Sequence, residues 1–334
     1  MNRNERRKLI AVVRNMTGRK VSNITFPGGK TRKSFRLNFD DGTSAIATQR
    51  RSDRRREREI DVMRTLGAQG APVPRVLGVE GGLMLQEDLG KTRLSEHLHA
   101  SAGDATAIAD ALDQAVDSMA RIHEAAAASG LADRSPLIGA DPSWIEGLLR
   151  CPEEIGSALG LKVPEYPLEP LQHLLRVREP SFVKWDSRPG NALLRDGQAY
   201  WFDWEDSGTR NAVDDLVWLL CDEFVTFKPE MQEALLHRYL PRFAAAFETS
   251  DEAMDYFAAM AIFHTVVRLS LIVRYKGDGS WWSMTRCLEG DKVGVTRRCA
   301  RRMVWRGAFW ADHLATTRPL ADWFRELEAH FEAA

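Results

Sequence analysis

Three polar side chains in the middle of the chain stand at spacings that suit phosphoryl transfer. The segment from Phe182 to Asp206 contains Asp186, then Asn191 five residues later, then Asp203 beyond a predicted hairpin turn. Phosphoryl transfer needs a base that orients the attacking hydroxyl and oxygen ligands that hold Mg²⁺ on the phosphates. An Asp and an Asn on one tight loop can supply the base and one ligand, and a second Asp across a hairpin can supply the other ligand.

This segment resembles the aminoglycoside phosphotransferase and choline kinase-like family, whose loop reads roughly His-Gly-Asp-x-x-x-x-Asn and is followed by Ile-Asp-Trp or Ile-Asp-Phe. Residues 184–191 and 201–205 match that spacing, and residues 214–216 match a downstream acidic landmark that is largely structural in the family. The resemblance implies Asp186 as the catalytic base and Asn191 with Asp203 as magnesium ligands.

The same resemblance implies ATP and Mg²⁺ as cofactors and a hydroxyl of a small molecule as the phosphate acceptor. Acceptors in the resembled family include aminoglycosides, amino sugars and amino alcohols such as choline. No recognisable activation segment ending in Ala-Pro-Glu follows Asp203, which disfavours a protein Ser/Thr kinase.

The first third of the chain carries further matches to the family. The Pro-Gly-Gly turn at residues 26–30 resembles the turn that covers the phosphates, where glycine lets the backbone approach the nucleotide. Glu59 resembles the glutamate that holds the phosphate-binding lysine. Residues 84–90 resemble the hinge between the lobes, whose backbone would hydrogen-bond adenine.

Two positions depart from the family pattern. The strand that should present Lys or Arg to the phosphates has Thr48 at the natural position, so Arg50 or Arg51 would have to reach in from the strand end. Lys184 stands where the family usually has His, and its ammonium group is expected to keep Asp186 ionised. The candidate nucleotide-binding residues are therefore Gly28, Gly29, Lys30, Arg50, Glu59, Gln86, Glu87 and Asp88.

Arg188, two residues beyond Asp186, is a second catalytic candidate. Eukaryotic-type protein kinases have Lys at that offset, and its charge reaches the γ-phosphate. Arg188 could stabilise the transition-state charge in the same way. The alternative is that Arg188 pairs with a neighbouring carboxylate such as Glu205.

The predicted elements place these residues in two lobes. Five strands and one main helix, over about residues 53–66, occupy the first part, and long helical patterns follow from residue 94 with one strand-turn-strand island at 181–206. This order predicts an α+β protein, and the resemblance implies a bilobal protein-kinase-like fold. We expect residues 1–88 to form the small β-rich lobe that covers the nucleotide and residues 89–334 to form the larger, mostly helical catalytic and acceptor-binding lobe. The longest helical patterns lie at residues 105–128, 229–247, 251–274 and 291–334.

Charge and cysteine usage fit an intracellular enzyme. The chain has a formal net charge of −1, but residues 1–88 carry +9 and the remainder −10. This division suggests a cleft between the lobes, with a positive side that suits a nucleotide and an acidic side that favours an amine-bearing or sugar-like acceptor. The alternative is that these charges only face solvent. The four cysteines form no CxxC pair, and the N-terminus has no secretory signal, so a reducing cytoplasm is the simplest location.

Three other classes were weighed. The arginine-rich run at 50–58 is interrupted by acids and lacks aromatic residues, which favours a solvated helix start over nucleic-acid binding. The apolar stretch at 256–275 contains His264 and Arg268, which favours a buried helix over a membrane span. The changes at Thr48 and Lys184 leave a nucleotide-binding pseudokinase or scaffold as the alternative to an enzyme.

Overall fold

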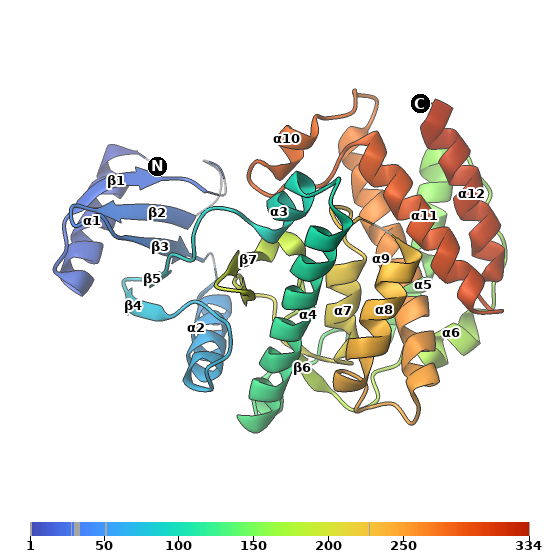
Figure 1. Cartoon of the computed structure of the whole chain (residues 1–334), viewed down its shortest axis with the longest axis horizontal. Coiled ribbons are helices and arrows are strands. Elements are labelled where there is room, and N and C mark those ends of the chain that lie inside the picture. Colours follow the sequence, from blue (N-terminus) through green and yellow to red (C-terminus); the bar gives the residue numbers. More distant parts are fainter. Residues whose placement is uncertain (1, 28, 30–33, 51, 227, 334) are drawn as a thin grey trace.

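The computed structural model describes residues 2–27, 29, 34–50, 52–226 and 228–333. A small β-rich part at one end joins a larger helical part (Figure 1). The predicted α+β class and bilobal protein-kinase-like arrangement are confirmed. The small part contains one antiparallel sheet with the strand order β1-β2-β3-β5-β4. Its strands are β1 (Val21–Thr25), β2 (Ser34–Phe39), β3 (Ser44–Gln49), β4 (Val76–Glu80) and β5 (Leu83–Glu87), and its helices are α1 (Arg3–Thr17) and α2 (Asp53–Ala68).

Two separate hydrophobic clusters hold the two helices of the small part. Leu9 and Val13, four residues apart on one face of α1, belong to the cluster that covers the sheet, together with Leu37. Met63 and Leu66 of α2 belong instead to the main core, which continues through the helical part. The helix that carries Glu59 is therefore anchored to the larger part of the molecule.

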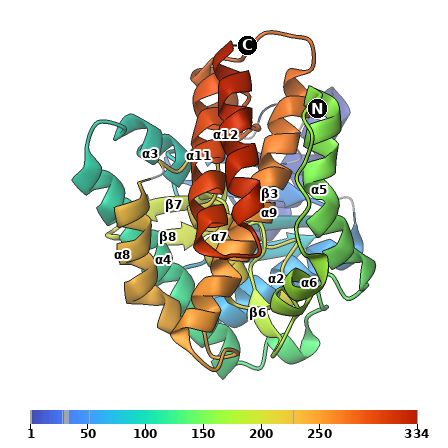
Figure 2. The ribbon, with the colours of Figure 1, turned by 90° about the vertical axis from the view of Figure 1, so that its right-hand side faces the viewer.

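The helical part is built around α9, which packs against α5, α7 and α11. Figure 2 shows α11 and α12 side by side, next to α9, with α5 on the other side of α9. The helices are α3 (Leu94–Ala100), α4 (Ala105–Ala128), α5 (Ser143–Leu159), α6 (Leu168–Leu174), α7 (Val213–Leu220), α8 (Pro229–Tyr239), α9 (Ser250–Lys276), α10 (Met284–Leu288), α11 (Arg297–His313) and α12 (Arg318–Ala333).

Two of the predicted helices are shorter than the sequence pattern indicated. The pattern at 229–247 becomes α8 and one 3₁₀ turn, Leu240–Arg242, because Pro241 has no backbone N–H to continue an α-helix. The pattern at 291–334 becomes two helices, since Pro319 suits only the first turn of a new helix. The prediction of helix at 105–128 is confirmed.

Helix α9 has the length and apolar character of a membrane span, but 78% of its most apolar window is buried inside the protein. Arg268 on this helix is also buried, and its guanidinium lies 2.5 Å from the Glu223 carboxylate. A buried ion pair of this kind belongs to a packed protein interior, as expected from the sequence.

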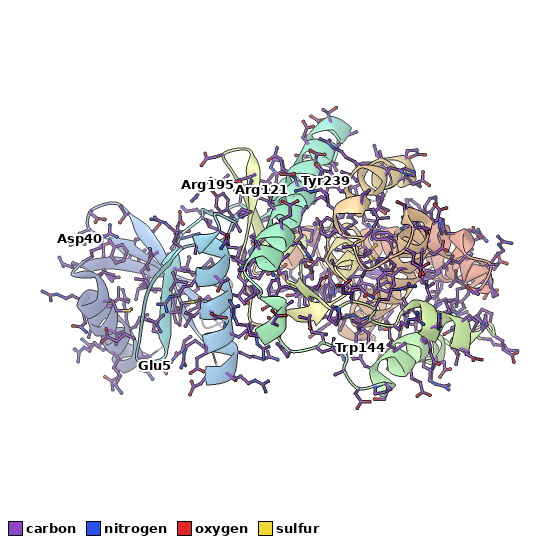
Figure 3. The ribbon with its side chains drawn as sticks, turned by 90° about the horizontal axis from the view of Figure 1, so that it is seen from below. Glu5, Asp40, Arg121, Trp144, Arg195 and Tyr239 are labelled. Carbon is purple, nitrogen blue, oxygen red and sulfur yellow. The ribbon has the colours of Figure 1, made fainter. Side chains whose placement is uncertain are left out.

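Two short antiparallel pairs carry the predicted catalytic island. β6 (Ser181–Val183) pairs with β9 (Gly208–Arg210), and β7 (Ala192–Arg195) pairs with β8 (Gln198–Trp201). Seen from below, Arg195 and Trp144 of α5 lie on opposite sides of the molecule (Figure 3). Strand β7 of this island lies between the sheet of the small part and the helices of the larger part (Figure 1).

Candidate active site

The buried carboxylate of Asp215 fixes the start of the loop that carries Asp186. Its oxygens accept hydrogen bonds from the backbone N–H groups of Lys184 (2.7 Å) and Trp185 (2.9 Å), and one of them lies 2.9 Å from Nε2 of His123. Asp215 is fully buried, so water does not compete for these bonds. These contacts agree with the structural role expected for this acidic segment.

The backbone of the loop is held in an unfavourable conformation. Trp185 and Asp186 have φ angles of 52° and 45°, in the left-handed region that side chains other than glycine rarely adopt. Residues in such conformations cost free energy and often occur at functional sites. The hydrogen bonds to Asp215 offset part of that cost and turn the Asp186 side chain toward Asn191.

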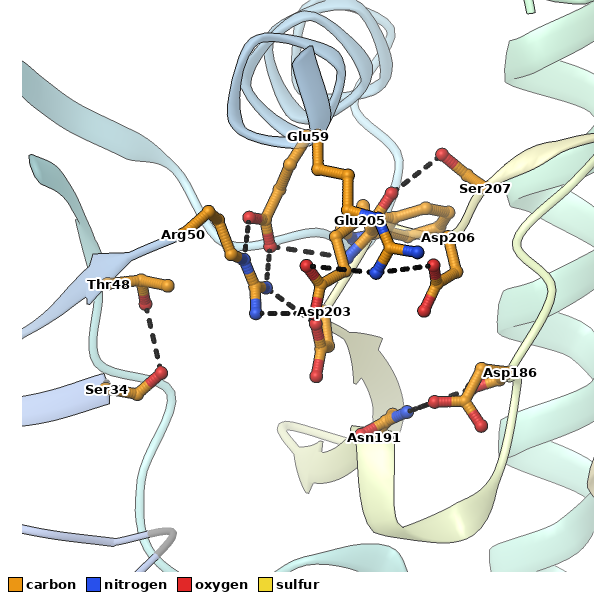
Figure 4. A network of polar contacts seen from close by, with 12 residues as sticks. Ser34, Thr48, Arg50, Glu59, Asp186, Asn191, Asp203, Glu205, Asp206 and Ser207 are labelled. Atoms are coloured by element: carbon orange, nitrogen blue, oxygen red, sulfur yellow. Dashed lines mark hydrogen bonds and ion pairs between the residues drawn. The ribbon is translucent and has the colours of Figure 1, made fainter. Parts of the chain in front are cut away.

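Asp186 and Asn191 are in direct contact (Figure 4). Nδ2 of Asn191 donates to Oδ2 of Asp186 at 2.8 Å and to its backbone carbonyl at 2.9 Å. With the amide nitrogen used in this way, the amide oxygen of Asn191 is the atom that could bind a cation. The sequence prediction that one loop brings these two residues together is correct.

Asp203 reaches the same region from the end of β8. Its φ is 64°, which makes it the third left-handed residue of the site after Trp185 and Asp186. The Lys184 ammonium group lies 3.0 Å from the Asp203 backbone carbonyl and 3.4 Å from the Asp186 carbonyl, so it joins the two loops. Asn191 and Asp203 both line one cleft between the sheet and the helical part.

That cleft encloses about 910 Å³ of space open to solvent. It lies between the sheet, the β5–α3 connection and the β7–β8 pair. It brings together most of the described residues that the sequence assigned to nucleotide and metal binding. Its walls include Thr48, Arg50, Glu59, Gln86, Glu87, Asp88, Gly90, Arg93, Asn191, Phe202 and Asp203.

Arg50 occupies the position expected of the missing strand lysine. It follows the last residue of β3, and its guanidinium lies 2.6 Å from Glu59, 2.6 Å from Asp203 and 3.0 Å from Glu205 (Figure 4). Burial opposes its charge, but the Glu59 hydrogen bond and the three carboxylates raise the Arg50 pKa above its ordinary value. Of the two arginines left open by the sequence, Arg50 makes these contacts, and Arg51 lies outside the described residues.

Glu59 is buried rather than solvated, with 1% of its side chain exposed. It accepts two hydrogen bonds from Arg50 and one, at 3.3 Å, from the backbone N–H of Trp204. Burial raises the Glu59 pKa, and the Arg50 contacts oppose that rise. An acid in this position holds Arg50 over the cleft.

The hinge carboxylates are engaged within the protein. Asp88 accepts hydrogen bonds from Arg36 (2.6 Å) and Ser44 (2.7 Å), and Glu87 lies 3.0 Å from Arg195. The Oε1 atom of Gln86 is buried and has no hydrogen-bond partner among the described residues. Acceptor and donor groups for an adenine ring must therefore come mainly from the hinge backbone and from Gln86.

The glycine turn is only partly described. Gly29 closes a turn by donating to the Phe26 carbonyl at 3.0 Å and has a φ of 85°, which favours glycine. The other two candidates in the turn, Gly28 and Lys30, lie outside the described residues. Pro27, next to them, lines the cleft.

Lys184 acts on Asp186 in the direction expected from the sequence, but burial acts against it. It is fully buried, and burial lowers its pKa. Burial raises the pKa of Asp186, and the opposing charges of Arg188 and Lys184 do not cancel that rise. Lys184 therefore opposes the rise in the Asp186 pKa as expected, whereas desolvation of the carboxylate, which the sequence did not reveal, outweighs the nearby charges. A carboxyl group with a raised pKa is a stronger base.

Arg188 is held away from Glu205. Its Nε lies 3.1 Å from Asp222 and its Nη2 lies 2.7 Å from Asp291, and all three side chains are buried. The alternative of a carboxylate partner is therefore correct in kind, although the partners differ from the Glu205 named as an example. Through these ion pairs, Arg188 links the catalytic loop to Asp222 and Asp291. Its action at the γ-phosphate stays a prediction.

The donor set fits a small hard cation. Among the residues that the structure describes, no group of three or more His, Cys, Asp or Glu side chains is arranged to hold a metal ion. The candidate ligands are one carboxylate, from Asp203, and one amide oxygen, from Asn191. Mg²⁺ typically takes one or two protein oxygens and completes its shell with water and substrate phosphates, so this set suits it.

Sequence reasoning missed the aromatic residues beside Asp186. A smaller hollow on its outer side is lined by Ile138, Trp185, Asp206 and Trp218. The ten tryptophans of the sequence are expected to form core or cleft walls, with one or two stacking on a sugar or ring substrate, but their positions in the sequence do not indicate which. Trp185 could have been noticed because it directly precedes the predicted base in the sequence. Trp218 belongs to α7, and only the fold brings it to this hollow.

Comparison with known proteins gives a family for this geometry. The model of the Phosphotransferase enzyme family matches residues 24–256, which is more than half of the chain. No curated protein sequence matches this one.

Solved structures share the fold at low sequence identity. The amicoumacin kinase hAmiN, in complex with AMP-PNP, Ca²⁺ and Ami, has a TM-score of 0.54 and 14% identity, with 88% of this chain and 98% of that chain covered. A choline/ethanolamine kinase family protein from Mesorhizobium loti has a TM-score of 0.52 and 17% identity, covering 94% and 98%. The streptomycin–ATP complex of APH(2")-IIa has a TM-score of 0.52 and 13% identity, covering 81% and 93%.

Proposed function

We propose that this chain, which belongs to the Phosphotransferase enzyme family, transfers the γ-phosphate of ATP to a hydroxyl of a small molecule with the help of Mg²⁺. The observation that carries the proposal is the convergence of Arg50, Asn191 and Asp203 on one cleft, with Asp186 bonded to Asn191 at its edge. Two structures of the same fold hold ATP or AMP-PNP, which supports a nucleotide in this cleft.

Asp186 would act on the acceptor. Asn191 binds its Oδ2, which leaves Oδ1 to orient the acceptor hydroxyl and to accept its proton. The raised pKa of this carboxyl group suits proton acceptance more than a fully solvated aspartate would. The left-handed backbone of the loop fixes the direction of the side chain before the acceptor arrives.

Arg50, Asn191 and Asp203 would act on the nucleotide. Arg50 contributes a permanent positive charge that Glu59 holds at the cleft wall, where it can bind phosphate oxygens. Asp203 and the amide oxygen of Asn191 would hold Mg²⁺. When bound, this ion neutralises charge on the phosphates during transfer.

The two lobes would divide the work. We propose that residues 1–88, with the glycine turn and Arg50, cover the nucleotide. Residues 89–334 would supply the catalytic loop and the acceptor site. The half-buried contact between Arg50 and Asp203 joins the two at the wall of the cleft.

A transfer assay with substituted variants tests the proposal. The protein is incubated with Mg·ATP and a mixed panel of hydroxyl-bearing small molecules, and each product is examined for the added mass of one phosphate group. The wild-type chain is expected to phosphorylate at least one acceptor, and Asp186→Asn to phosphorylate none at a comparable rate. Nucleotide binding without transfer to any acceptor would favour the pseudokinase or scaffold alternative.

A further inference from the structure

A large hollow that adjoins the catalytic loop lies in the helical part, between α5 and α9. It encloses about 1670 Å³ of space open to solvent. Trp185 and Trp218 line both this groove and the smaller hollow that contains Asp186, so the two spaces meet at these rings. The groove is lined by Ser143, Trp144, Gly147, Leu148, Cys151, Glu154, Ile155, Ala158, Trp185, Trp218, Met260, His264, Val267, Ser270, Leu271, Val273 and Arg274.

The walls of this groove are mainly apolar and aromatic. Trp185 and Trp218 contact each other edge to face with their centroids 5.3 Å apart, and Trp218 contacts His264 at 4.6 Å. Only Glu154 and Arg274 carry charge at ordinary pH, and their charges are opposite. Burial lowers the His264 pKa to about 3, so this ring is neutral. The groove itself therefore has no net charge, and the nearest further carboxylates, Asp186 and Asp206, line the adjoining hollow.

Several polar atoms in these walls lack partners. Nε1 of Trp218, Nε2 of His264 and Oγ of Ser270 are buried, with no hydrogen-bond partner among the described residues. Buried polar atoms in folded proteins are nearly always paired. These three atoms have almost no accessible surface, so they lie behind the groove wall, and the wall that an occupant meets is mainly apolar.

Charge and size argue against the acceptors first suggested by the acidic lobe. A molecule with several ammonium groups needs several carboxylates to replace its lost hydration, and this groove offers one. The Arg210 guanidinium lies 4.4 Å from the centroid of Trp144 and 5.9 Å from that of Trp185, so a fixed cation already interacts with these two rings. The groove is also far larger than a choline-sized molecule.

We propose that the phosphate acceptor is a bulky, largely apolar alcohol that carries a ring system and at most one charge. Its ring would pack against Trp185 and Trp218, and its hydroxyl would lie at Asp186. This identification rests on the proposed function for the position of the reacting hydroxyl. The binding chemistry of the groove is independent of turnover.

Direct binding tests this proposal separately from catalysis. Isothermal titration calorimetry with the full chain and Mg·AMP-PNP would use testosterone and 2-naphthaleneethanol as apolar alcohols, and kanamycin and choline as polar cations. We expect at least one apolar alcohol to bind and neither cation to do so. Binding of kanamycin or choline, or failure of both apolar alcohols, would overturn the proposal.

Substitutions locate the binding. Trp218→Ala should weaken apolar-alcohol binding about tenfold or more, since stacking on an aromatic ring and its buried area are lost. Val267→Arg offers a second route, because Val267 is 36% exposed and its substitution narrows the groove without disturbing the core. Trp305→Ala is the matched control, since Trp305 is an exposed tryptophan of α11 outside the groove. Equal binding by Val267→Arg and the wild type would place the alcohol elsewhere and contradict the assignment.

Two further readouts separate the remaining outcomes. If apolar alcohols bind in the groove but none is phosphorylated by Mg·ATP, the acceptor chemistry of the groove stands and the proposed function fails. If light scattering shows a dimer that Val267→Arg dissociates, the occupant is a second copy of this chain and the small-molecule proposal is wrong.

Discussion

At the scale of single residues, the site depends on how one arginine replaces a lysine. Strand β3 ends at Gln49, so Arg50 enters the cleft from beyond the strand rather than from within it. The longer guanidinium side chain reaches Glu59 and Asp203 together. Because several charges meet in a partly buried place, removal of one leaves the others without compensation.

Substitution of Arg50 should affect both stability and nucleotide binding. Arg50→Ala is expected to lower the free energy of unfolding by about 3 kcal/mol, since Glu59 remains buried without its partner, and to raise the KM for ATP. The double variant Arg50→Ala/Glu59→Gln should recover part of the stability but not the KM. Urea denaturation and steady-state kinetics measure these effects, with Arg54→Ala, an exposed arginine of α2, as control. An unchanged KM in Arg50→Ala would remove Arg50 from the nucleotide site.

The pH profile should report the environment of Asp186. Its pKa is raised above 3.8, so activity that needs the ionised carboxylate should disappear as pH falls through that raised value. Lys184→Met removes a positive charge that lowers this pKa, and the acid limb of kcat/KM should then move to higher pH. Lys162→Met, an exposed lysine, should leave the limb in place. A shift of the limb to lower pH in Lys184→Met would contradict this electrostatic account.

The sequence predicted the residues of this site better than their electrostatics. Asp186, Asn191 and Asp203 were recognisable because their spacing along the chain nearly determines their positions on one loop and one hairpin. The effect of Lys184 on the Asp186 pKa was predicted in the right direction, but the net rise was not, because desolvation depends on how much of the chain covers the carboxylate. The burial of Glu59 was hidden for the same reason.

At the scale of elements, the catalytic loop is clamped from two sides. Asp215 at the start of α7 holds the backbone at 184–185, and Asp291, in the connection between α10 and α11, holds Arg188 and lies 3.3 Å from Arg93. The loop therefore depends on a segment near the C-terminus in which the sequence showed no motif. Contacts across more than a hundred residues leave no local pattern to recognise.

Gly190→Ala should test this clamp. A Cβ atom at Gly190 would lie 2.0 Å from Oδ1 of Asp291, so the Asp291 side chain must leave its contacts with Arg188 and Arg93 or the loop must move. We expect a loss of about 1–3 kcal/mol in unfolding free energy and a lower kcat. Gly103→Ala is the matched control, because no heavy atom lies within 4 Å of the added Cβ. If both variants retain wild-type stability and kcat, the clamp has no role in positioning the loop.

At the scale of the whole molecule, the order of elements allowed the two-part fold to be predicted. Five strands followed by helices could be predicted from the spacing of apolar residues and from the turn residues. The observed positions of α2 and α4 agree with that prediction. The groove between α5 and α9 was not predictable in the same way. Its aromatic walls come from α5, the catalytic loop and α7, and α5 itself was absent from the predicted elements.

Nucleotide binding should join the two parts of the molecule through a divalent cation. Addition of AMP-PNP with Mg²⁺ is expected to raise the midpoint of thermal unfolding, because a ligand that binds only the folded state stabilises it. EDTA should remove most of this rise in the wild-type chain. Asp203→Asn should show little rise even with Mg²⁺. An equal rise with and without the cation would mean that Asp203 is no metal ligand.

The central claim is that Asp186 acts on the acceptor while Asn191, Asp203 and Arg50 act on the nucleotide. Its most direct test is the rate of phosphoryl transfer by Asp186→Asn as a function of Mg·ATP concentration, at a fixed concentration of an acceptor that the wild type phosphorylates. The account predicts that kcat falls by about 100-fold or more, while the KM for ATP stays unchanged. A kcat close to that of the wild type, or a loss that appears only as a raised KM for ATP, would contradict it.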